Sequence, residues 1–253
     1  MRSLQRSIVV VLGVFCVGCS DAKSAARESA PPIKPPAAAE GPSAAAPGAD
    51  AASGERRTIL FLGTSLTAGL GLDPDSAYPQ QLQRKIDARS LPYQVVNAGV
   101  SGETSAGLMR RLEWVLQGRA DVIMVETGAN DGLRGLPVAS TKVAIGDILT
   151  RIKRERPNAT VVLAQMEAPP NLGREYTSAF HKMFADLARE HGVVLLPFFL
   201  NGVAGFPEFN QADGVHPNNE GERMVTENVW RVLQPLLMPR PAADMPVAPR
   251  ASN

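Results

Sequence analysis

Five short apolar runs alternate with longer segments of helical spacing, and this alternation constrains the fold more than any other feature of the chain. The runs are TILFLG (58–63), YQVVNAG (93–99), DVIMVETGAND (121–131), ATVVLAQM (159–166) and VVLLPFF (193–199). Nearly continuous apolar runs of this length are typical of parallel strands that are covered on both faces. We therefore predict five strands in one parallel sheet.

The segments between the runs carry apolar residues at helical spacing. In 105–117, Leu108 and Leu112 fall on one face, and 143–155 and 176–192 show the same pattern. Such periodicity indicates amphipathic helices. Alternating strands and helices predict an α/β fold with helices on both faces of the sheet.

The N-terminus has the pattern of an export signal. Two arginines, Arg2 and Arg6, precede the apolar run SIVVVLGVFCVGC (7–19). This run is shorter than the roughly 20 residues that span a bilayer. A positive start, a short apolar core and small residues at its end predict that residues 1–19 are an export signal.

The end of that signal, CVGC, resembles a bacterial lipobox, in which Cys19 would become the lipid-modified first residue. Cys16 stands where the usual leucine would be, so ordinary secretion and an uncleaved anchor remain alternatives. All three place the body outside the cytoplasm, on the periplasmic side of a bacterial membrane. Ser20 is not the aspartate typical of inner-membrane retention, which weakly favours the outer membrane.

Composition sets the remaining boundaries. Residues 20–55 are dominated by Ala, Pro, Ser and Gly, and 239–253 are similar, so we predict a disordered tether and a flexible tail around a folded domain at 56–238. Both cysteines lie in the export signal, which leaves the domain without a disulfide or a thiolate metal site. The net charge of +1 gives no basic excess for nucleic acid.

Polar and glycine-rich segments follow each predicted strand. They are GTSLTAGLG, NAGVSGETS, TGANDGLRG, MEAPPNLG and, after a longer loop, DGVHPNNEG. In open parallel sheets, sites form beyond the carboxyl ends of the strands. The sequence therefore predicts a site at this edge.

Ser65 and His216 have the residue types of a nucleophile and its base. Ser65 comes just after the first strand, where its N–H is among the unpaired donors of a helix start. His216 is the only histidine in a loop at this edge, and Asp213 would fix its tautomer. The alternatives are that Ser65 or Thr64 caps the helix, and that DGVHPN is an ordinary turn.

Acyl transfer also needs donors aimed at the developing oxyanion. Gly102 offers an unobstructed backbone N–H, and Asn130 offers a side-chain amide. The alternatives are a turn glycine and an Asx-turn.

The ordered blocks around Ser65, Gly102, Asn130 and His216 resemble the four motifs of the SGNH hydrolases, also called the GDSL family. The blocks are GTSLTAGLG, NAGVSGETSAG, GANDGLRG and DGVHPNNEG, and the resemblance spans 58 to about 237. Within the family, the chain is most similar to the bacterial thioesterase I, lysophospholipase L1 and arylesterase group.

The resemblance implies a three-layer, flavodoxin-like fold. It also implies a nucleophile at Ser65, the remaining triad members at Asp213 and His216, and oxyanion donors at Gly102, Asn130 and the Ser65 N–H. No metal or other cofactor is implied. Thr64 replaces the family's usual aspartate before the serine, and the consequence of that exchange stays open.

Substrate choice is left broader. Candidate substrate-binding residues are Leu133, Arg134, Pro170 and Leu172. The apolar residues of these loops could equally pack as core, and Arg134 could be solvated.

We expect a serine esterase, monomeric, acting on aryl or medium-chain acyl esters, lysophospholipids or acyl thioesters. A carbohydrate O-acetylesterase on the same fold and a non-catalytic lipid- or glycan-binding lipoprotein are the alternatives. If Cys19 is modified, the membrane is a further partner through the lipid anchor.

Overall fold

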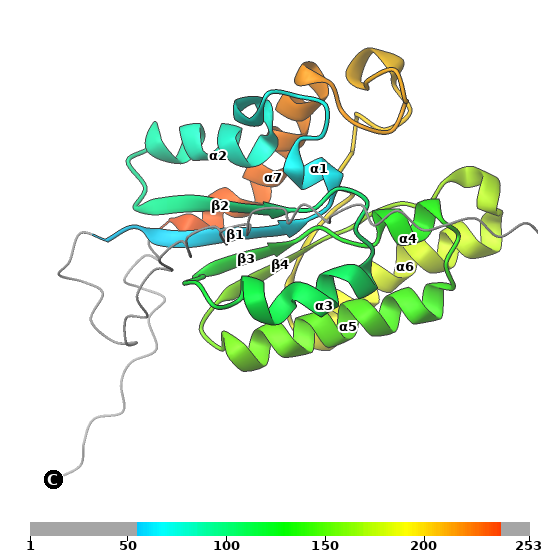
Figure 1. Cartoon of the computed structure of the whole chain (residues 1–253), viewed down its shortest axis with the longest axis horizontal. Helices are drawn as coiled ribbons and strands as arrows, with labels where there is room; N and C mark the ends of the chain where they lie inside the picture. The colour runs from blue at the N-terminus through cyan, green and yellow to red at the C-terminus, as the bar shows by residue number, and fades with distance from the viewer. Residues whose placement is uncertain (1–54, 239–253) are drawn as a thin grey trace, which may run out of the picture. The chain divides into compact units, whose positions relative to one another are not determined.

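The computed structural model describes residues 55–238 (Figure 1). The predicted export signal, the tail and, apart from Glu55, the tether lie outside these residues, as does Cys19. No helix within 55–238 is both long and apolar enough to cross a bilayer.

The predicted parallel sheet is confirmed. Its strands are β1 (Arg57–Gly63), β2 (Tyr93–Gly99), β3 (Val122–Val125), β4 (Thr160–Ala164) and β5 (Val194–Leu196). They are all parallel, in the order β2-β1-β3-β4-β5. This is the flavodoxin-like order, in which the chain reverses direction across the sheet next to β1.

Helices cover both faces of the sheet, as predicted (Figure 1). One layer holds α1 (Ser65–Ala68), α2 (Tyr78–Asp87) and α7 (Asn219–Leu237). The other holds α3 (Ser105–Val115), α4 (Ala129–Leu133), α5 (Val138–Glu155) and α6 (Arg174–His191). Three short 3₁₀ turns complete the elements: η1 (Pro74–Ser76), η2 (Pro170–Leu172) and η3 (Pro207–Phe209).

The core forms where the central strands meet the helices. Ile59, Phe61 and Leu62 of β1 are fully buried. Tyr78 of α2 packs edge-on between Phe61 and Phe199, with ring centroids 5.5 and 5.3 Å away. Aromatic pairs in this geometry add stabilisation beyond the area that they bury.

The prediction that every strand is covered on both faces was wrong for β2. This strand pairs only with β1, and Val96 is 42% exposed. The physical reason is its place at the edge of the sheet, since α3, which follows it, packs against α5 instead.

The carboxyl ends of β1 and β2 lie side by side, with Gly63 opposite Gly99. A Cβ on Gly99 would lie 2.4 Å from the backbone nitrogen of Ala68 in α1. Only glycine therefore lets α1, which carries Ser65, pack this closely on the edge of the sheet.

Candidate active site

Ser65 is the first residue of α1, and Thr64 is its cap. The Thr64 hydroxyl accepts from the N–H of Leu66 at 3.4 Å. Of the two alternatives for the cap, the structure therefore selects Thr64. Ser65 is 7% exposed, and its hydroxyl is available for another partner.

That partner is His216. The Ser65 Oγ lies 2.8 Å from His216 Nε2, although 151 positions separate them in the chain. The other ring nitrogen, Nδ1, lies 2.6 Å from Asp213 Oδ2. The three predicted side chains are thus joined in one row, in the order hydroxyl, imidazole, carboxylate.

Asp213 also shapes the turn that carries the histidine. Its Oδ1 accepts from the N–H groups of Val215 at 2.9 Å and His216 at 3.0 Å, and Gly214 takes φ +68°. DGVHPN is therefore a tight turn as well as a partner for the imidazole. The N–H groups of His216 and Val215, with the His216 ring, lower the pKa of Asp213 to about 2, so it is ionised at neutral pH.

Gln211 ties the His216 loop to the Ser65 loop. Its backbone N–H donates to His216 O at 2.7 Å. Its side-chain amide donates to Leu70 O at 2.8 Å and to Pro217 O at 2.9 Å. This residue was not predicted from the sequence, because a loop glutamine carries no signal of partners on a segment 141 positions away.

The predicted oxyanion donors come from neighbouring loops. Gly102 has φ +76°, and the Asn130 amide donates to Glu103 O at 3.0 Å. Asn130 therefore reaches across to the Gly102 turn instead of forming an Asx-turn. No acceptor in residues 55–238 bonds the N–H of Ser65 or of Gly102, so both remain available to a ligand.

Asp131, which was not predicted from the sequence, fixes the relation between these two loops. It is 2% exposed and accepts from the Ser105 N–H at 2.9 Å and from the Ser105 hydroxyl at 2.6 Å. This joins the start of α3, just after Gly102, to α4, which carries Asn130.

A second unpredicted carboxylate, Glu126, lies beneath the nucleophile turn. It is fully buried and accepts from the Thr64 N–H at 2.8 Å, and its oxygens lie 3.0 Å from the hydroxyls of Thr64 and Thr67. Burial raises the pKa of Glu126 to about 7, against the opposing effect of these hydrogen bonds. A lone acid at the end of the apolar run VIMVE was the available sequence signal.

Glu222 of α7 lies in the same interior. It is 1% exposed and accepts from the Tyr78 N–H at 2.7 Å. Burial raises its pKa to about 8, and the charge of Glu126 adds to the shift. The hydroxyl of Tyr78 lies 2.9 Å from Thr67 Oγ1, which links this carboxylate to the Glu126 network.

The candidate substrate-binding residues lie in two adjoining segments, the end of α4 and η2. Leu133 is 49% exposed, and Arg134 is exposed and donates to Gly102 O at 2.8 Å. Pro170 and Leu172 form η2, and a Cβ on Gly135 would lie 3.6 Å from Leu172. Within the described part of the chain, no group of three or more His, Cys, Asp or Glu side chains could hold a metal ion.

Comparisons with known proteins identify the family of this chain. The family model described as the GDSL-like Lipase/Acylhydrolase family matches residues 61–224. Esterase TesA of Pseudomonas aeruginosa is 37% identical over 72% of this chain and 90% of its own. The Escherichia coli K12 protein named thioesterase 1/protease 1/lysophospholipase L1 is 38% identical over 71% of this chain and 85% of its own.

A solved structure gives the same relation in three dimensions. The psychrotrophic esterase EstA from Pseudoalteromonas, inhibited by monoethylphosphonate, is 32% identical, with a TM-score of 0.68. The match covers 72% of this chain and 98% of that one. The chain belongs to the GDSL-like lipase/acylhydrolase family, that is, to the SGNH hydrolases.

Proposed function

We propose that the protein is a serine esterase that hydrolyses carboxylic esters through an acyl-enzyme on Ser65. The observation that carries the proposal is the row of contacts from Ser65 Oγ to His216 Nε2 at 2.8 Å and from His216 Nδ1 to Asp213 at 2.6 Å. An imidazole at this distance can take the hydroxyl proton as the serine attacks.

In the first step, Ser65 Oγ bonds to the carbonyl carbon and His216 takes its proton. The carbonyl oxygen gains the negative charge, for which the N–H groups of Ser65 and Gly102 and the Asn130 amide are the proposed donors. His216 then gives the proton to the leaving alcohol or thiol as its bond to the carbonyl carbon breaks. Water repeats the sequence on the acyl-enzyme and releases the acid.

The proposed substrates are aryl or medium-chain acyl esters, lysophospholipids and acyl thioesters. Relatives named esterase and thioesterase/lysophospholipase support this range. The exposed Leu133 at the end of α4 and the partly exposed Leu172 in η2 support an apolar acyl chain.

Hydrolysis of p-nitrophenyl esters from acetate to palmitate by the full chain tests the proposal. Ser65→Ala should lower kcat by about 10³-fold or more. Ser178→Ala, at an exposed serine on α6, is the matched control and should leave the rate unchanged. An optimum at acetate alone would favour the O-acetylesterase, and no hydrolysis by the wild type would contradict esterase function.

We further propose that the protein is exported, carries a lipid on Cys19 and acts as a monomer. The residues 7–19 and the CVGC sequence support the anchor. Labelling with a fatty-acid probe should mark the wild type and not Cys19→Ala, whereas label on both proteins would contradict the assignment.

A further inference from the structure

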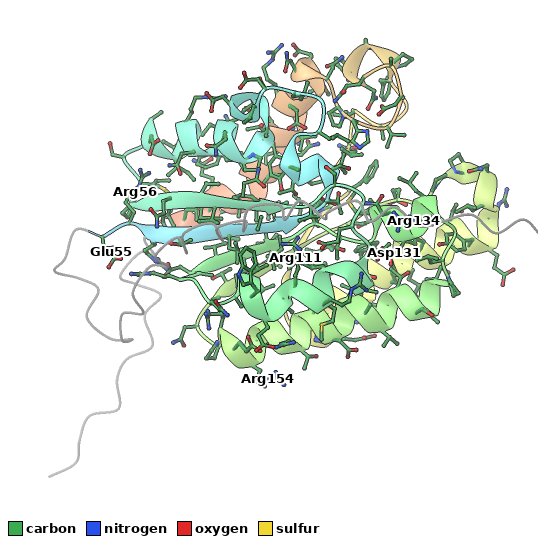
Figure 2. The ribbon with its side chains drawn as sticks, in the orientation of Figure 1. Glu55, Arg56, Arg111, Asp131, Arg134 and Arg154 are labelled. Atoms are coloured by element: carbon green, nitrogen blue, oxygen red, sulfur yellow. The ribbon has the colours of Figure 1, made fainter. Side chains whose placement is uncertain are left out.

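A groove of about 430 Å³ adjoins the proposed oxyanion hole. It shares Gly102 with that site, and Glu103, Arg110, Arg111 and Arg134 are among the other residues that line it. Figure 2 shows Arg134 at the α4 segment and Arg111 between the sheet and α3. The groove is therefore bounded by the Gly102 turn, by α3 and by the segment that carries Asn130.

One of its three arginines is neutralised. Arg111 Nε and Nη2 each lie 2.7 Å from an oxygen of Glu103, and Nη2 also donates to Ala98 O at 2.8 Å. Both side chains of this ion pair are largely buried, at 19% and 9% exposed. Arg111 and Glu103 thus form a structural pair in the wall, without net charge.

The other two arginines keep their charge. Arg110 donates to Ala106 O at 3.1 Å, and Arg134 donates to Gly102 O at 2.8 Å. Both side chains are exposed, and no carboxylate in residues 55–238 forms an ion pair with either. A carbonyl oxygen uses one N–H of a guanidinium that has five, so donors remain for an anion.

Arg134 also stands next to the reacting end of the site. A Cβ on Gly102 would lie 3.9 Å from Arg134 Nη2, so the guanidinium packs against the residue whose N–H is a proposed oxyanion donor. The guanidinium of Arg134 therefore lies beside the proposed oxyanion hole. Paired guanidinium groups favour phosphate, which accepts their forked N–H donors.

We propose that Arg110 and Arg134 form a subsite for a phosphate group on the leaving side of the substrate. The proposal rests on the esterase function above and gives it a preference for phosphate-bearing esters over neutral ones. Two sources supply this chemistry: the glycerophosphate headgroup of a lysolipid and the nucleotide phosphates of an acyl-coenzyme A thioester.

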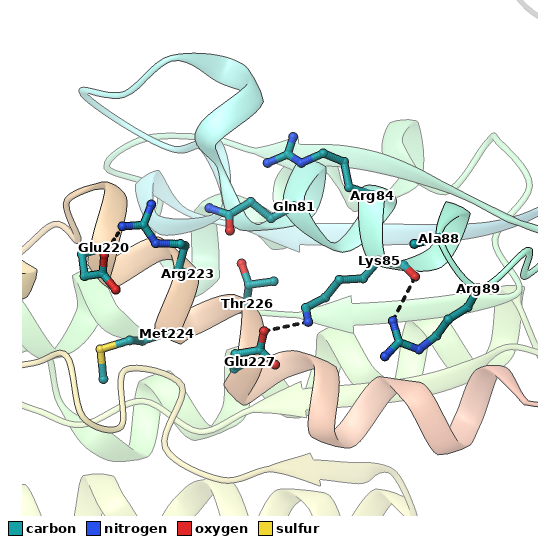
Figure 3. A pocket seen from close by; sticks show the side chains of 10 residues that line it. All are labelled: Gln81, Arg84, Lys85, Ala88, Arg89, Glu220, Arg223, Met224, Thr226 and Glu227. Atoms are coloured by element: carbon teal, nitrogen blue, oxygen red, sulfur yellow. Dashed lines mark hydrogen bonds and ion pairs between the residues drawn. The ribbon is translucent and has the colours of Figure 1, made fainter.

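A second groove, between α2 and α7, also carries an excess of positive charge (Figure 3). Four cationic and two acidic side chains line it, and two ion pairs join Lys85 to Glu227 and Arg223 to Glu220. It shares no residue with the proposed site. Its Arg84 is exposed and donates to one backbone carbonyl, that of Asp75, as Arg134 does to Gly102. Arg84 is therefore a matched control.

The test compares kcat/KM for p-nitrophenyl butyrate, an acyl-coenzyme A and an anionic lysophosphatidylglycerol, each with the full chain. Arg110→Gln, which removes no contact of the oxyanion loop, should lower the ratio of phosphate-bearing to neutral kcat/KM by about 10-fold, mainly through KM. Arg134→Gln should lower the ratio as well, whatever it does to both rates. Arg84→Gln should not change it.

Arg110→Lys should restore part of the ratio, because it keeps the charge and loses the fork. A ratio that falls for only one phosphate substrate identifies the source. A ratio unchanged in both glutamine variants would overturn the subsite while leaving the esterase function intact. A wild type that hydrolyses no ester at all would overturn the function, and the subsite with it.

Discussion

Thr64 and Glu126 make three close contacts directly before Ser65. The Thr64 N–H donates to Glu126 Oε2 at 2.8 Å, and the Thr64 hydroxyl lies 3.0 Å from both carboxylate oxygens. The threonine that replaces the family's usual aspartate thus gives a buried acid a neutral hydroxyl as its partner.

Restoring the aspartate should therefore make stability more sensitive to pH. In Thr64→Asp a second carboxylate would face Glu126 in the interior, and like charges raise each other's pKa. A raised carboxyl pKa gives stability that is present in acid and lost as pH rises through it. The melting temperature should fall by several degrees more at pH 8 than at pH 5.

Thr64→Asn is the control for that comparison, since it keeps a neutral donor and a cap. Equal pH dependence in the two variants would show that Glu126 does not sense the charge at position 64. Adding Glu126→Gln to Thr64→Asp should remove the extra pH dependence.

The raised pKa of Glu222 predicts that the stability of the wild type itself depends on pH. Its pKa is raised from an ordinary value of 4.5 to about 8. Its contribution to stability is therefore full below about pH 4.5 and is lost as pH rises through about 8. Glu222→Gln, which can still accept from the Tyr78 N–H, should lose less stability than the wild type between pH 5 and 8.

Chemical denaturation at several pH values measures this difference. Glu220 is an exposed acid in the same first turn of α7, two residues before Glu222. The Glu220→Gln protein should therefore show the pH dependence of the wild type. If the free energy of unfolding of Glu222→Gln depended on pH as steeply as that of the wild type, another group would have to cause the pH dependence.

Asp213→Asn should reduce catalysis without unfolding the loop. Asparagine keeps an oxygen for the N–H groups of Val215 and His216, but it removes the charge that faces the imidazolium. We expect kcat to fall by about 100-fold or more, with KM little changed. Because the pKa of Asp213 is about 2, the wild type should not lose this charge between pH 4 and 8. Steady-state kinetics that show less than a threefold loss would remove Asp213 from the mechanism.

Gln211 should act as a positioning residue. In Gln211→Glu the amide that donates to Leu70 O and Pro217 O becomes an oxygen that both carbonyls repel. The loops of Ser65 and His216 should separate slightly, and kcat should fall by about 3- to 10-fold for every ester. Gln81→Glu, which loses a similar bond to Ser76 O away from the site, provides the comparison. Equal kinetics in both variants would contradict a positioning role for Gln211.

The fold could be predicted because each buried parallel strand is a continuous apolar run in the sequence. Residues Ile59–Leu62 of β1 are fully buried or nearly so, and they form an apolar run in the sequence. At β2 the same inference failed, because the exposure of Val96 depends on the sheet order and not on its neighbours in the chain. The run 121–131 was longer than its strand, since Gly128 at φ +96° starts α4.

The site was predictable only where a motif marks it. The blocks that contain Ser65 and His216 are recognisable as motifs in the sequence, although the contact between the two residues joins distant segments. Glu126 and Gln211 depend on partners 62 and 141 positions away, and nothing in their local sequence names those partners. Arg134 was a candidate from the sequence. The net charge of its groove could not be predicted, because it depends on the ion pair between Arg111 and Glu103, which only the structure shows.

The central claim is that Ser65 is the nucleophile that His216 activates. The most direct measurement is mass spectrometry of the protein after reaction with an ethyl p-nitrophenyl phosphonate. We predict one adduct, on Ser65, that is absent in Ser65→Ala and formed far more slowly in His216→Ala. An adduct on another residue, or equal labelling of wild type and Ser65→Ala, would contradict the account.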